Sequence, residues 1–456
     1  MSIKQTAAIF ACKAAKLALR VLGRGGTTLP GMIALRICPE ILSHAASGVR
    51  TVIITGTNGK TTTARIVEEM CVQTGIPHIS NRSGANLITG ITTEFISNFS
   101  LSGKPKKHFA IIECDEAASK EVCRQVQPEI ILLTNLFRDQ LDRYGEITQT
   151  LENVLVGIKN APNATVCLNA DCSLCVSISQ SVPNKIVYFG IDSSIYVNQP
   201  EEASDAPFCI NCKHEYDYSY HTFAHLGGFS CPSCGYSRPE AEVAVTEILD
   251  LALDTSTVRT RVMGLEDEHI INLPGGYNIY NAIAALAVAA VASIPAESAK
   301  RAVAGFNCGF GRMERFNMGN AAARMILVKN PAGANQVLNF LSALEDETLL
   351  ALCLTDKTAD GTDVSWIWDV QFERIADFGE KITKVLIAGN RNADMAIRLK
   401  YAGVSVDSIE LIDNYDDLIS AMSKQANPVI IMPTYTAMMD LREKMSAAFG
   451  GGNFWD

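Results

Sequence analysis

The chain has 456 residues, enough for about three domains, since single hydrophobic cores seldom grow beyond roughly 250–300 residues. Hydrophobic residues make up 48% and charged residues 19%, so the chain has the composition of a packed globular protein. The formal net charge of −10 argues against a nucleic-acid binder, and no apolar run reaches the roughly 18 residues that span a bilayer. The 14 cysteines, many in apolar segments, indicate reduced thiols, and we therefore expect a cytoplasmic protein.

Residues 1–47 predict a helical lead before the first core strand. Its apolar residues are interrupted by Lys4, Lys13, Lys16 and Arg20, and no small-residue cleavage site follows a hydrophobic core, so a signal peptide is not indicated. We expect an amphipathic helix that packs on the protein. At most, its basic face makes peripheral contact with anionic lipid.

Residues 51–63 (Thr-Val-Ile-Ile-Thr-Gly-Thr-Asn-Gly-Lys-Thr-Thr-Thr) predict a buried strand, a glycine turn and the start of a helix. The turn is shorter than that of an ordinary P-loop, because its two glycines enclose only two residues. Glycines let the backbone approach phosphate oxygens, the lysine supplies positive charge, and a hydroxyl can reach Mg²⁺. The alternative is an unoccupied strand-to-helix turn. The pattern favours a nucleotide site made by Gly56, Thr57, Asn58, Gly59, Lys60, Thr61 and Thr62.

Four later segments carry polar residues at the ends of buried patterns. Residues 109–116 form a buried strand ending in carboxylates, and residues 130–135 form another strand, followed by 138–145. Residues 276–285 predict a helix bearing asparagines, and 311–316 contain a Gly-Arg-x-Glu turn. With the glycine turn, these segments resemble, in order, the Mur ligases and folylpolyglutamate synthetases. Those enzymes couple a carboxylate to an amine through an acyl phosphate.

The resemblance implies roles for individual residues. Thr61 and Glu113 are expected to hold Mg²⁺, and Lys60 the β- and γ-phosphates of ATP, with Lys60 and Glu113 acting in catalysis. The asparagine helix is expected to contact the adenine and phosphates, and the arginine of the last turn to meet the phosphates. Gln140 stands where the family usually has a histidine. The further nucleotide-binding residues implied in this way are Asn278, Asn281 and Arg312.

Buried strands alternate with helical patterns along most of the chain, which is typical of α/β domains. The strands expected in residues 48–317 are 51–55, 109–113, 130–134, 165–169 and 186–189. Those expected in residues 318–456 are 325–329, 349–354, 384–388, 408–412 and 428–432. We therefore predict a Mur-ligase-type P-loop ATPase domain at 48–317 and a smaller, doubly wound α/β domain at 318–456.

An insertion at about residues 205–238 contains two Cys-x-x-Cys pairs, the second in a Cys-Pro-x-Cys-Gly turn. Four thiolates at this spacing suit tetrahedral Zn²⁺, and four sulfurs leave no position for water, so we expect a structural zinc ribbon. The alternatives are free thiols or disulfides formed on oxidation. The histidines between the pairs are spare ligands at best, and the pair Cys172/Cys175 is expected to be a helix turn with buried thiols. The expected ligands are Cys209, Cys212, Cys231 and Cys234.

Taken as a whole, the chain resembles the branch of the Mur ligase family that amidates lipid II. The resemblance implies ATP-dependent conversion of the α-carboxylate of D-glutamate in the lipid II stem peptide to D-isoglutamine. The ammonia is expected to come from a glutamine amidotransferase subunit of the GatD type. Among four aspartates around two tryptophans in the later part of the chain, Asp363, or secondly Asp360, is expected to complete the catalytic site of that partner.

The C-terminal part departs from the amino-acid-adding Mur ligases at residues 327–331 (Leu-Val-Lys-Asn-Pro), which lack their Asp and His. An enzyme whose amine is ammonia needs no pocket for a second amino acid, so the difference is compatible with amidation. The alternative enzyme is a folylpolyglutamate- or muramyl-type amino-acid ligase that acts without a glutaminase. An ATP-binding scaffold whose zinc ribbon docks RNA or protein is disfavoured by the acidic charge.

Overall fold

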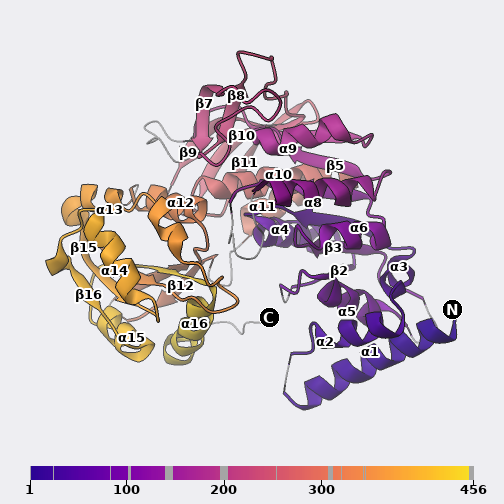
Figure 1. Ribbon diagram of the computed structural model, residues 1–456, viewed down its shortest axis with the longest axis horizontal. Coiled ribbons are helices and arrows are strands. Elements are labelled where there is room, and N and C mark those ends of the chain that lie inside the picture. Colours follow the sequence, from indigo (N-terminus) through magenta and orange to yellow (C-terminus); the bar gives the residue numbers. More distant parts are fainter. Residues whose placement is uncertain are drawn as a thin grey trace.

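The structure is a computed structural model that describes the chain except for residues 1, 24, 83, 101–103, 139–146, 196–203, 253, 307–311, 320, 343, 345 and 451–456. It contains two large sheets and one hairpin. The C-terminal part, orange to yellow in Figure 1, lies beside the larger part formed by the rest of the chain. The N-terminal helices lie along the edge of the larger part, far from the hairpin β7–β8.

Three helices open the chain: α1 (Ile3–Val21), α2 (Leu29–Ile37) and α3 (Ile41–Ala46). Ser2 and Gln5 begin α1 with a reciprocal capping box, in which each side chain accepts a hydrogen bond from the other residue's backbone N–H. α1 packs on α2 and on α5 (Ile88–Asn98). None of the helices in the described part of the chain is both long and apolar enough to cross a bilayer.

The central sheet has nine strands in the order β11-β10-β9-β6-β5-β4-β1-β3-β2, with β10 antiparallel to both of its neighbours. The parallel strands bring their carboxyl ends to one edge, where Ile54 of β1 lies opposite Glu113 of β3 and Leu132 of β4. The strands are β1 (Arg50–Thr55), β2 (His78–Ser80), β3 (Phe109–Glu113), β4 (Ile130–Leu133), β5 (Thr165–Asn169), β6 (Ile186–Ile191), β9 (Val243–Leu251), β10 (Ser256–Val262) and β11 (Leu265–Ile271).

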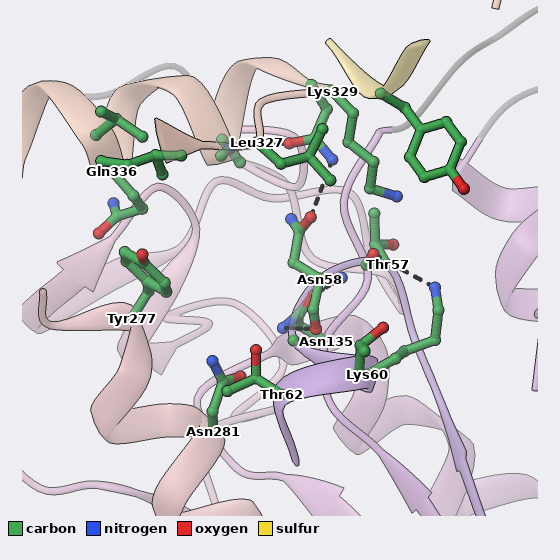
Figure 2. Close-up of a pocket in the computed structure, with 18 of the residues that line it drawn as sticks. Thr57, Asn58, Lys60, Thr62, Asn135, Tyr277, Asn281, Leu327, Lys329 and Gln336 are labelled. Atoms are coloured by element: carbon green, nitrogen blue, oxygen red, sulfur yellow. Dashed lines mark hydrogen bonds between the residues drawn. The ribbon is translucent and has the colours of Figure 1, made fainter. Parts of the chain in front are cut away.

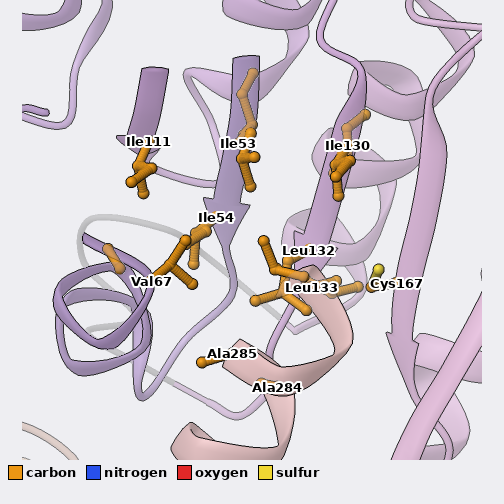
Figure 3. Packing of buried hydrophobic residues seen from close by; sticks show 14 of the residues in the cluster. Ile53, Ile54, Val67, Ile111, Ile130, Leu132, Leu133, Cys167, Ala284 and Ala285 are labelled. Carbon is orange, nitrogen blue, oxygen red and sulfur yellow. The ribbon is translucent and has the colours of Figure 1, made fainter. Parts of the chain in front are cut away.

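Helices cover this sheet and bury its aliphatic side chains. Figure 3 shows Ala284 and Ala285 of the alanine-rich helix α10 close to Leu132 and Leu133 of β4. α10 is apolar on nearly every side, as expected for a helix buried all round. The helices are α4 (Lys60–Thr74), α6 (Ser119–Val126), α8 (Ile147–Lys159), α9 (Ser173–Ile178), α10 (Tyr277–Ala292) and α11 (Ala296–Gly305).

The second sheet has six strands in the order β12-β13-β17-β14-β15-β16, all parallel except β12. Side chains alternate along its strands, so Leu350 and Leu352 join one buried cluster while Leu349 and Ala351 join another on the opposite face. The elements are β12 (Arg312–Asn317), β13 (Ala322–Ile326), α12 (Pro331–Ser342), β14 (Thr348–Cys353), α13 (Glu373–Asp377), β15 (Ile382–Ala388), α14 (Asn392–Tyr401), β16 (Ile409–Leu411), α15 (Tyr415–Ser423), β17 (Val429–Pro433) and α16 (Tyr435–Phe449).

The α/β fold expected from the sequence is confirmed, and the five strands expected in the central part are all present. The strand expected at 325–329 instead occupies 322–326, because the chain turns at Asn330 and Pro331 to begin α12. The antiparallel strands β9 to β11 were not expected. The domain boundary at 317–318 stays a prediction, although β12, which lies before it, pairs with β13 of the second sheet.

The two large sheets are also linked by ion pairs. Asp254, between β9 and β10, pairs with Arg315 of β12 at 2.6 Å and with Arg324 of β13. Burial raises the pKa of the Asp254 carboxyl, but the two guanidinium groups outweigh it and hold that pKa below its ordinary value. The carboxylate is therefore an ionised link between the two parts.

Candidate active site

A cavity of about 450 Å³ lies between the glycine turn after β1 and the C-terminal part of the chain. In Figure 2, Lys60, Thr62 and Asn281 lie on one side of it, and Leu327 and Lys329 on the other. All seven residues of the expected nucleotide turn except Gly56 line the cavity. This is the edge of the sheet where the parallel strands end, the usual place for a ligand in such folds.

The two glycines of the turn are required by its geometry. Gly56 has φ +120°, and a Cβ there would lie 2.4 Å from Oγ1 of Thr134. Gly59 has φ +88°, and a Cβ there would lie 2.2 Å from Oδ1 of Asn281. Both positions therefore exclude a side chain by conformation and by close approach.

The two residues after β4, Thr134 and Asn135, hold the turn in place. Asn135 accepts a hydrogen bond from the backbone N–H of Asn58 through Oδ1 at 2.9 Å and from that of Thr57 through its carbonyl at 2.9 Å. Thr134 Oγ1 donates to the carbonyl of Asn58 at 2.7 Å. The Thr-Asn pair after β4 thus fixes the shape of the turn.

Lys60 is buried, and its Nζ donates to Oε1 of Glu116 at 2.8 Å and to the carbonyl of Gly56. Beside it, Oγ1 of Thr61 donates to Oε2 of Glu113 at 2.6 Å. The turn therefore places one ammonium, one hydroxyl and two carboxylates at the same end of the cavity.

Glu113 is oriented by its neighbours. Asn81 accepts from the backbone N–H of Glu113 at 2.9 Å and donates to its carbonyl at 2.7 Å, while Asn86 donates to its side chain at 3.4 Å. A hydroxyl and a carboxylate in contact are oxygen donors of the kind that Mg²⁺ prefers. The donor set therefore fits the metal expected from the sequence.

The first turns of α10 supply the expected asparagines. Asn281 donates to Oδ1 of Asn278 at 2.8 Å, and Asn278 donates to the carbonyl of Pro274 at 2.7 Å. Both line the cavity next to Gly59 and Thr62. The structure thus brings the asparagine helix together with the glycine turn.

Several cavity residues were not assigned to the site by the sequence analysis, and most of them come from the C-terminal part of the chain. Asn330 donates to Oδ1 of Asn58 at 3.1 Å, so it joins the C-terminal part directly to the turn. Lys329, Gln336 and Tyr277 also line the cavity, and Figure 2 shows Gln336 close to Tyr277. No local motif marks Gln336, although the departure at residues 327–331 marked the segment before it.

The insertion that carries the two Cys-x-x-Cys pairs also reaches the cavity. Its hairpin consists of β7 (Asp217–Phe223) and β8 (Leu226–Ser230). Phe223, the last residue of β7, lines the cavity and stacks on Phe137 with ring centroids 5.6 Å apart. Before it, Thr222 bonds to the hydroxyl of Tyr280 on α10 at 2.7 Å. The hairpin is therefore packed against the helix that carries the asparagines.

The four cysteines of the insertion converge, with all their sulfur atoms within 4.8 Å of one another. Burial raises the pKa of the Cys209 thiol, but donation by the backbone N–H groups of Cys212 and Asn211 outweighs it and lowers that pKa to about 6. In the described part of the chain, no histidine joins the cluster: His225 lies by Cys172 instead, with Nε2 3.6 Å from its sulfur. The site fits a closed, structural Zn²⁺.

The two aspartates expected to serve a partner differ in environment. Asp360 is buried and accepts from Oγ1 of Thr355 and from the backbone N–H of Thr436, both at 2.7 Å. Asp363 is half-buried and accepts from the backbone N–H of Ser365 at 2.8 Å. Asp360 therefore braces its own domain, and of the two only Asp363 is open enough to meet another chain.

Some expected site residues lie outside the described part of the structure. They are residues 139–145, including Gln140, and Gly311. Arg312 begins β12, but its side chain is not among those described, so its contact with phosphates stays a prediction.

Comparison with known proteins agrees with this architecture. Residues 54–221 match the Mur ligase middle domain family, and residues 327–438 match the MurT ligase C-terminal family. The chain is 34% identical to the lipid II isoglutaminyl synthase (glutamine-hydrolyzing) subunit MurT of Streptococcus pneumoniae, over 98% of both chains. It is 32% identical to the subunit of the same name from Staphylococcus aureus, over 99% of this chain and 100% of that one.

Solved structures show the same fold at lower sequence identity. A pseudomurein peptide ligase type C from Methanothermus fervidus aligns with a TM-score of 0.66 and 19% identity, over 90% of this chain and 80% of that one. The folylpolyglutamate synthase of Mycobacterium tuberculosis, solved with ADP and AMPPCP, aligns with a TM-score of 0.61 and 14% identity, over 95% and 99%. From its fold and its full-length similarity to the two MurT subunits, the chain belongs to the MurT family of Mur-type ligases.

Proposed function

We propose that this chain is the ligase subunit of a lipid II isoglutaminyl synthase. It uses ATP to activate the α-carboxylate of D-glutamate in the lipid II stem peptide, and ammonia converts the activated group to the amide of D-isoglutamine. Full-length similarity to two subunits with that name supports the substrate. The observation that carries the chemistry is the cluster of Lys60, Thr61 and Glu113 at one end of the cavity.

The proposed reaction has two steps. A carboxylate oxygen of the substrate attacks the γ-phosphorus of ATP, and the bond between that phosphorus and the bridging oxygen breaks. ADP departs, and the substrate becomes an acyl phosphate. The nitrogen of ammonia then attacks the acyl carbon, inorganic phosphate leaves, and the nitrogen loses a proton to become the amide. In such a phosphoryl transfer the protein contributes mainly positioning and charge neutralisation.

The residues of the turn suit these tasks. We propose that Lys60 neutralises the β- and γ-phosphates, for which it must exchange its ion pair with Glu116. Thr61 and Glu113 would hold Mg²⁺, which supplies further charge neutralisation when it is bound. The backbone of residues 56–62, together with Asn278, Asn281 and Arg312, is proposed to hold the rest of the nucleotide.

Ammonia is scarce at neutral pH because most of it is protonated, so a glutaminase that delivers it directly has a clear advantage. Burial raises the pKa of the Cys71, Cys123 and Cys353 thiols to about 12, which makes these three poor candidates for a glutaminase nucleophile. Burial also raises the pKa of Cys172, but hydrogen bonds with Cys175 and His225 outweigh it and lower that pKa; this thiol is fully buried, where a substrate does not reach it. We therefore propose a separate glutaminase subunit of the GatD type. Asp363, half-exposed on the C-terminal domain, is our candidate for completing its catalytic site.

The experiment is an amidation assay with the purified chain, a GatD-type glutaminase subunit, glutamine, ATP, Mg²⁺ and lipid II. Mass spectrometry of the product distinguishes a carboxamide from the addition of a whole amino acid, which the folylpolyglutamate- or muramyl-type alternative predicts. Consumption of ATP without amide formation, or amino-acid addition without the glutaminase, would overturn the proposal. An Asp363→Asn variant that keeps ATP binding but loses glutaminase stimulation would support the partner contact. Because the proposed reaction consumes ATP, we propose that it takes place in the cytoplasm.

A further inference from the structure

The solvent-facing side of α1 is apolar along its whole length. Ile3, Phe10, Leu17 and Val21 are 91%, 66%, 64% and 80% exposed, although large apolar side chains usually find cover. These four residues and two alanines are spaced three or four residues apart, which places all six on one face of the helix. The six residues of this apolar stripe are Ile3, Ala7, Phe10, Ala14, Leu17 and Val21.

The opposite face of α1 is already in use. Ala8, Ile9 and Cys12 are buried there, and the helix packs on α2 and α5. Lys13 and Lys16 tie it to α5, Lys13 through the carbonyl of Phe99 and Lys16 through Oγ of Ser97 at 2.8 Å. In Figure 1, α1 lies at the outer edge of the molecule. Because its large apolar side chains are exposed, the stripe faces away from the protein.

The charge around this stripe selects its partner. Every charged side chain before Glu40 is basic, whereas the whole chain has a net charge of −10. Lys4 and Arg20 are exposed beside the stripe, and the acidic side chain paired with α1 is Glu94, which faces Lys16. Two copies of α1 that paired through this stripe would bring like charges together, whereas anionic lipid headgroups would neutralise them.

We propose that α1 is an interfacial helix that docks this chain on an anionic lipid membrane. The apolar stripe enters the boundary between headgroups and acyl chains, and Lys4 and Arg20 beside it contact the headgroups. The proposal goes beyond the proposed function, on which it rests for one point: lipid II is a membrane-bound substrate, so docking would bring the ligase to it. The helix would lie on the membrane without spanning it.

The test is co-sedimentation of the full chain with vesicles of phosphatidylcholine alone or mixed with phosphatidylglycerol. We expect binding to the mixed vesicles only. Phe10→Asp/Leu17→Asp should weaken that binding at least about tenfold, because each apolar side chain kept out of the lipid loses its transfer free energy. The matched control is Leu265→Asp/Val406→Asp, which alters two equally exposed apolar residues elsewhere and should leave binding unchanged.

Several results would overturn the proposal. The first is absence of binding to the mixed vesicles, and the second is binding that survives Phe10→Asp/Leu17→Asp. The third is loss, in this variant, of self-association or of binding to the purified glutaminase subunit, because that loss would show that the stripe binds a protein. Because the assay contains neither ATP nor lipid II, it does not depend on the proposed reaction. Amidation of a soluble stem peptide without vesicle binding would refute only the membrane contact, and vesicle binding without amidation would refute only the function.

A second inference comes from Gln336 in the nucleotide cavity. Its side chain is buried and lines the cavity from α12, and neither its Nε2 nor its Oε1 has a hydrogen-bond partner among the residues that the structure describes. A buried amide without partners is costly, which indicates that a ligand satisfies it. Figure 2 places Gln336 near Tyr277 and away from Lys60 at the phosphate end.

We infer that Gln336 recognises the adenine base of the nucleotide. A carboxamide offers one donor and one acceptor side by side, which matches the N7 acceptor and the N6 amino donor of adenine, whereas guanine presents two acceptors, N7 and O6, on the same edge. The inference deepens the proposed function by assigning base selectivity to the same cavity.

Calorimetric titration of the full chain with nonhydrolysable analogues of ATP and GTP tests this role. Gln336→Leu should weaken binding of the ATP analogue at least about tenfold, since a good bidentate contact gives about that discrimination. It should also reduce the preference of the chain for the ATP analogue over the GTP analogue. Gln336→Glu, which keeps the size but loses the donor, should reduce the preference as well. Unchanged preference in both variants would overturn the inference, whereas failure of the unaltered chain to bind either analogue would overturn the proposed function.

Discussion

Replacement of Gly59 by alanine has two effects on the expected nucleotide turn: it strains the backbone, and it places a methyl group against a neighbouring side chain. Gly59 and Gly75 bound the same helix, α4, and both have positive φ, +88° and +68°. An alanine in this left-handed backbone conformation costs about 1–2 kcal/mol of stability. A Cβ at Gly75 would meet nothing within 4 Å, whereas one at Gly59 would lie 2.2 Å from Oδ1 of Asn281. Gly75→Ala therefore measures the conformational cost alone.

Gly59→Ala adds the cost of the contact. Either the turn moves, or Asn281 leaves its hydrogen bond to Asn278, and overpacking of this kind costs about 1–3 kcal/mol. ATP must restore the turn to its phosphate-binding shape, so this cost reduces affinity by about 5- to 140-fold. Gly75→Ala should lower the melting temperature and leave affinity unchanged.

Calorimetric titration with a nonhydrolysable ATP analogue, together with thermal unfolding, measures both effects. In an Asn281→Ala background the contact is gone, so Gly59→Ala should cost less affinity there than in the natural chain. Equal affinities of Gly59→Ala and Gly75→Ala, or no coupling to Asn281, would refute the reasoning.

Lys60→Ala should reduce ATP consumption at least about 100-fold, through lost charge neutralisation, and should lower the melting temperature because it leaves the buried carboxylate of Glu116 unpaired. Adding Glu116→Gln should restore the melting temperature but not the activity; recovered ATP consumption would contradict the role of Lys60. Glu113→Gln should raise the Mg²⁺ concentration for half-maximal ATP turnover at least about tenfold, and an unchanged Mg²⁺ dependence would remove Glu113 from the metal site. Cys234→Ser should lower both the zinc content measured by elemental analysis and the melting temperature, whereas full retention of zinc would contradict the four-cysteine site. The pKa of Asp254 is held below its ordinary value, so its ion pairs stabilise the fold above about pH 4 and lose this effect as pH falls through the folded-state pKa. Asp254→Asn should thus destabilise the chain at neutral pH but not in strong acid, and equal unfolding midpoints at neutral pH would refute this.

The local part of the candidate site could be predicted because each of its segments is a short, recognisable stretch of the chain. Each part lies at or directly after the end of a buried strand: the turn from Gly56 to Thr62, the carboxylate of Glu113 and the Thr-Asn pair after β4. In a parallel sheet such strand ends meet at one edge, so a correct strand assignment is enough to bring them together. The four cysteines were predictable for a similar reason, because their spacing alone suits a metal.

Other features needed the tertiary structure, since no short-range pattern encodes them. Asn330 and Gln336 reach the cavity only because the C-terminal part lies against the glycine turn, and Phe223 only because the zinc hairpin packs on α10. The distinction between Asp360 and Asp363 also depended on burial, since both stand in the same segment of sequence.

The amino-acid sequence by itself determined the α/β class, the glycine turn after the first core strand and the two converging cysteine pairs, because strand periodicity, glycine conformation and cysteine spacing are local properties. Tertiary structure alone decided which distant side chains complete the cavity and which face of α1 stays uncovered. Both depend on how separate elements pack, and residues far apart in the chain, such as Asn58 and Asn330, meet only after that packing is formed.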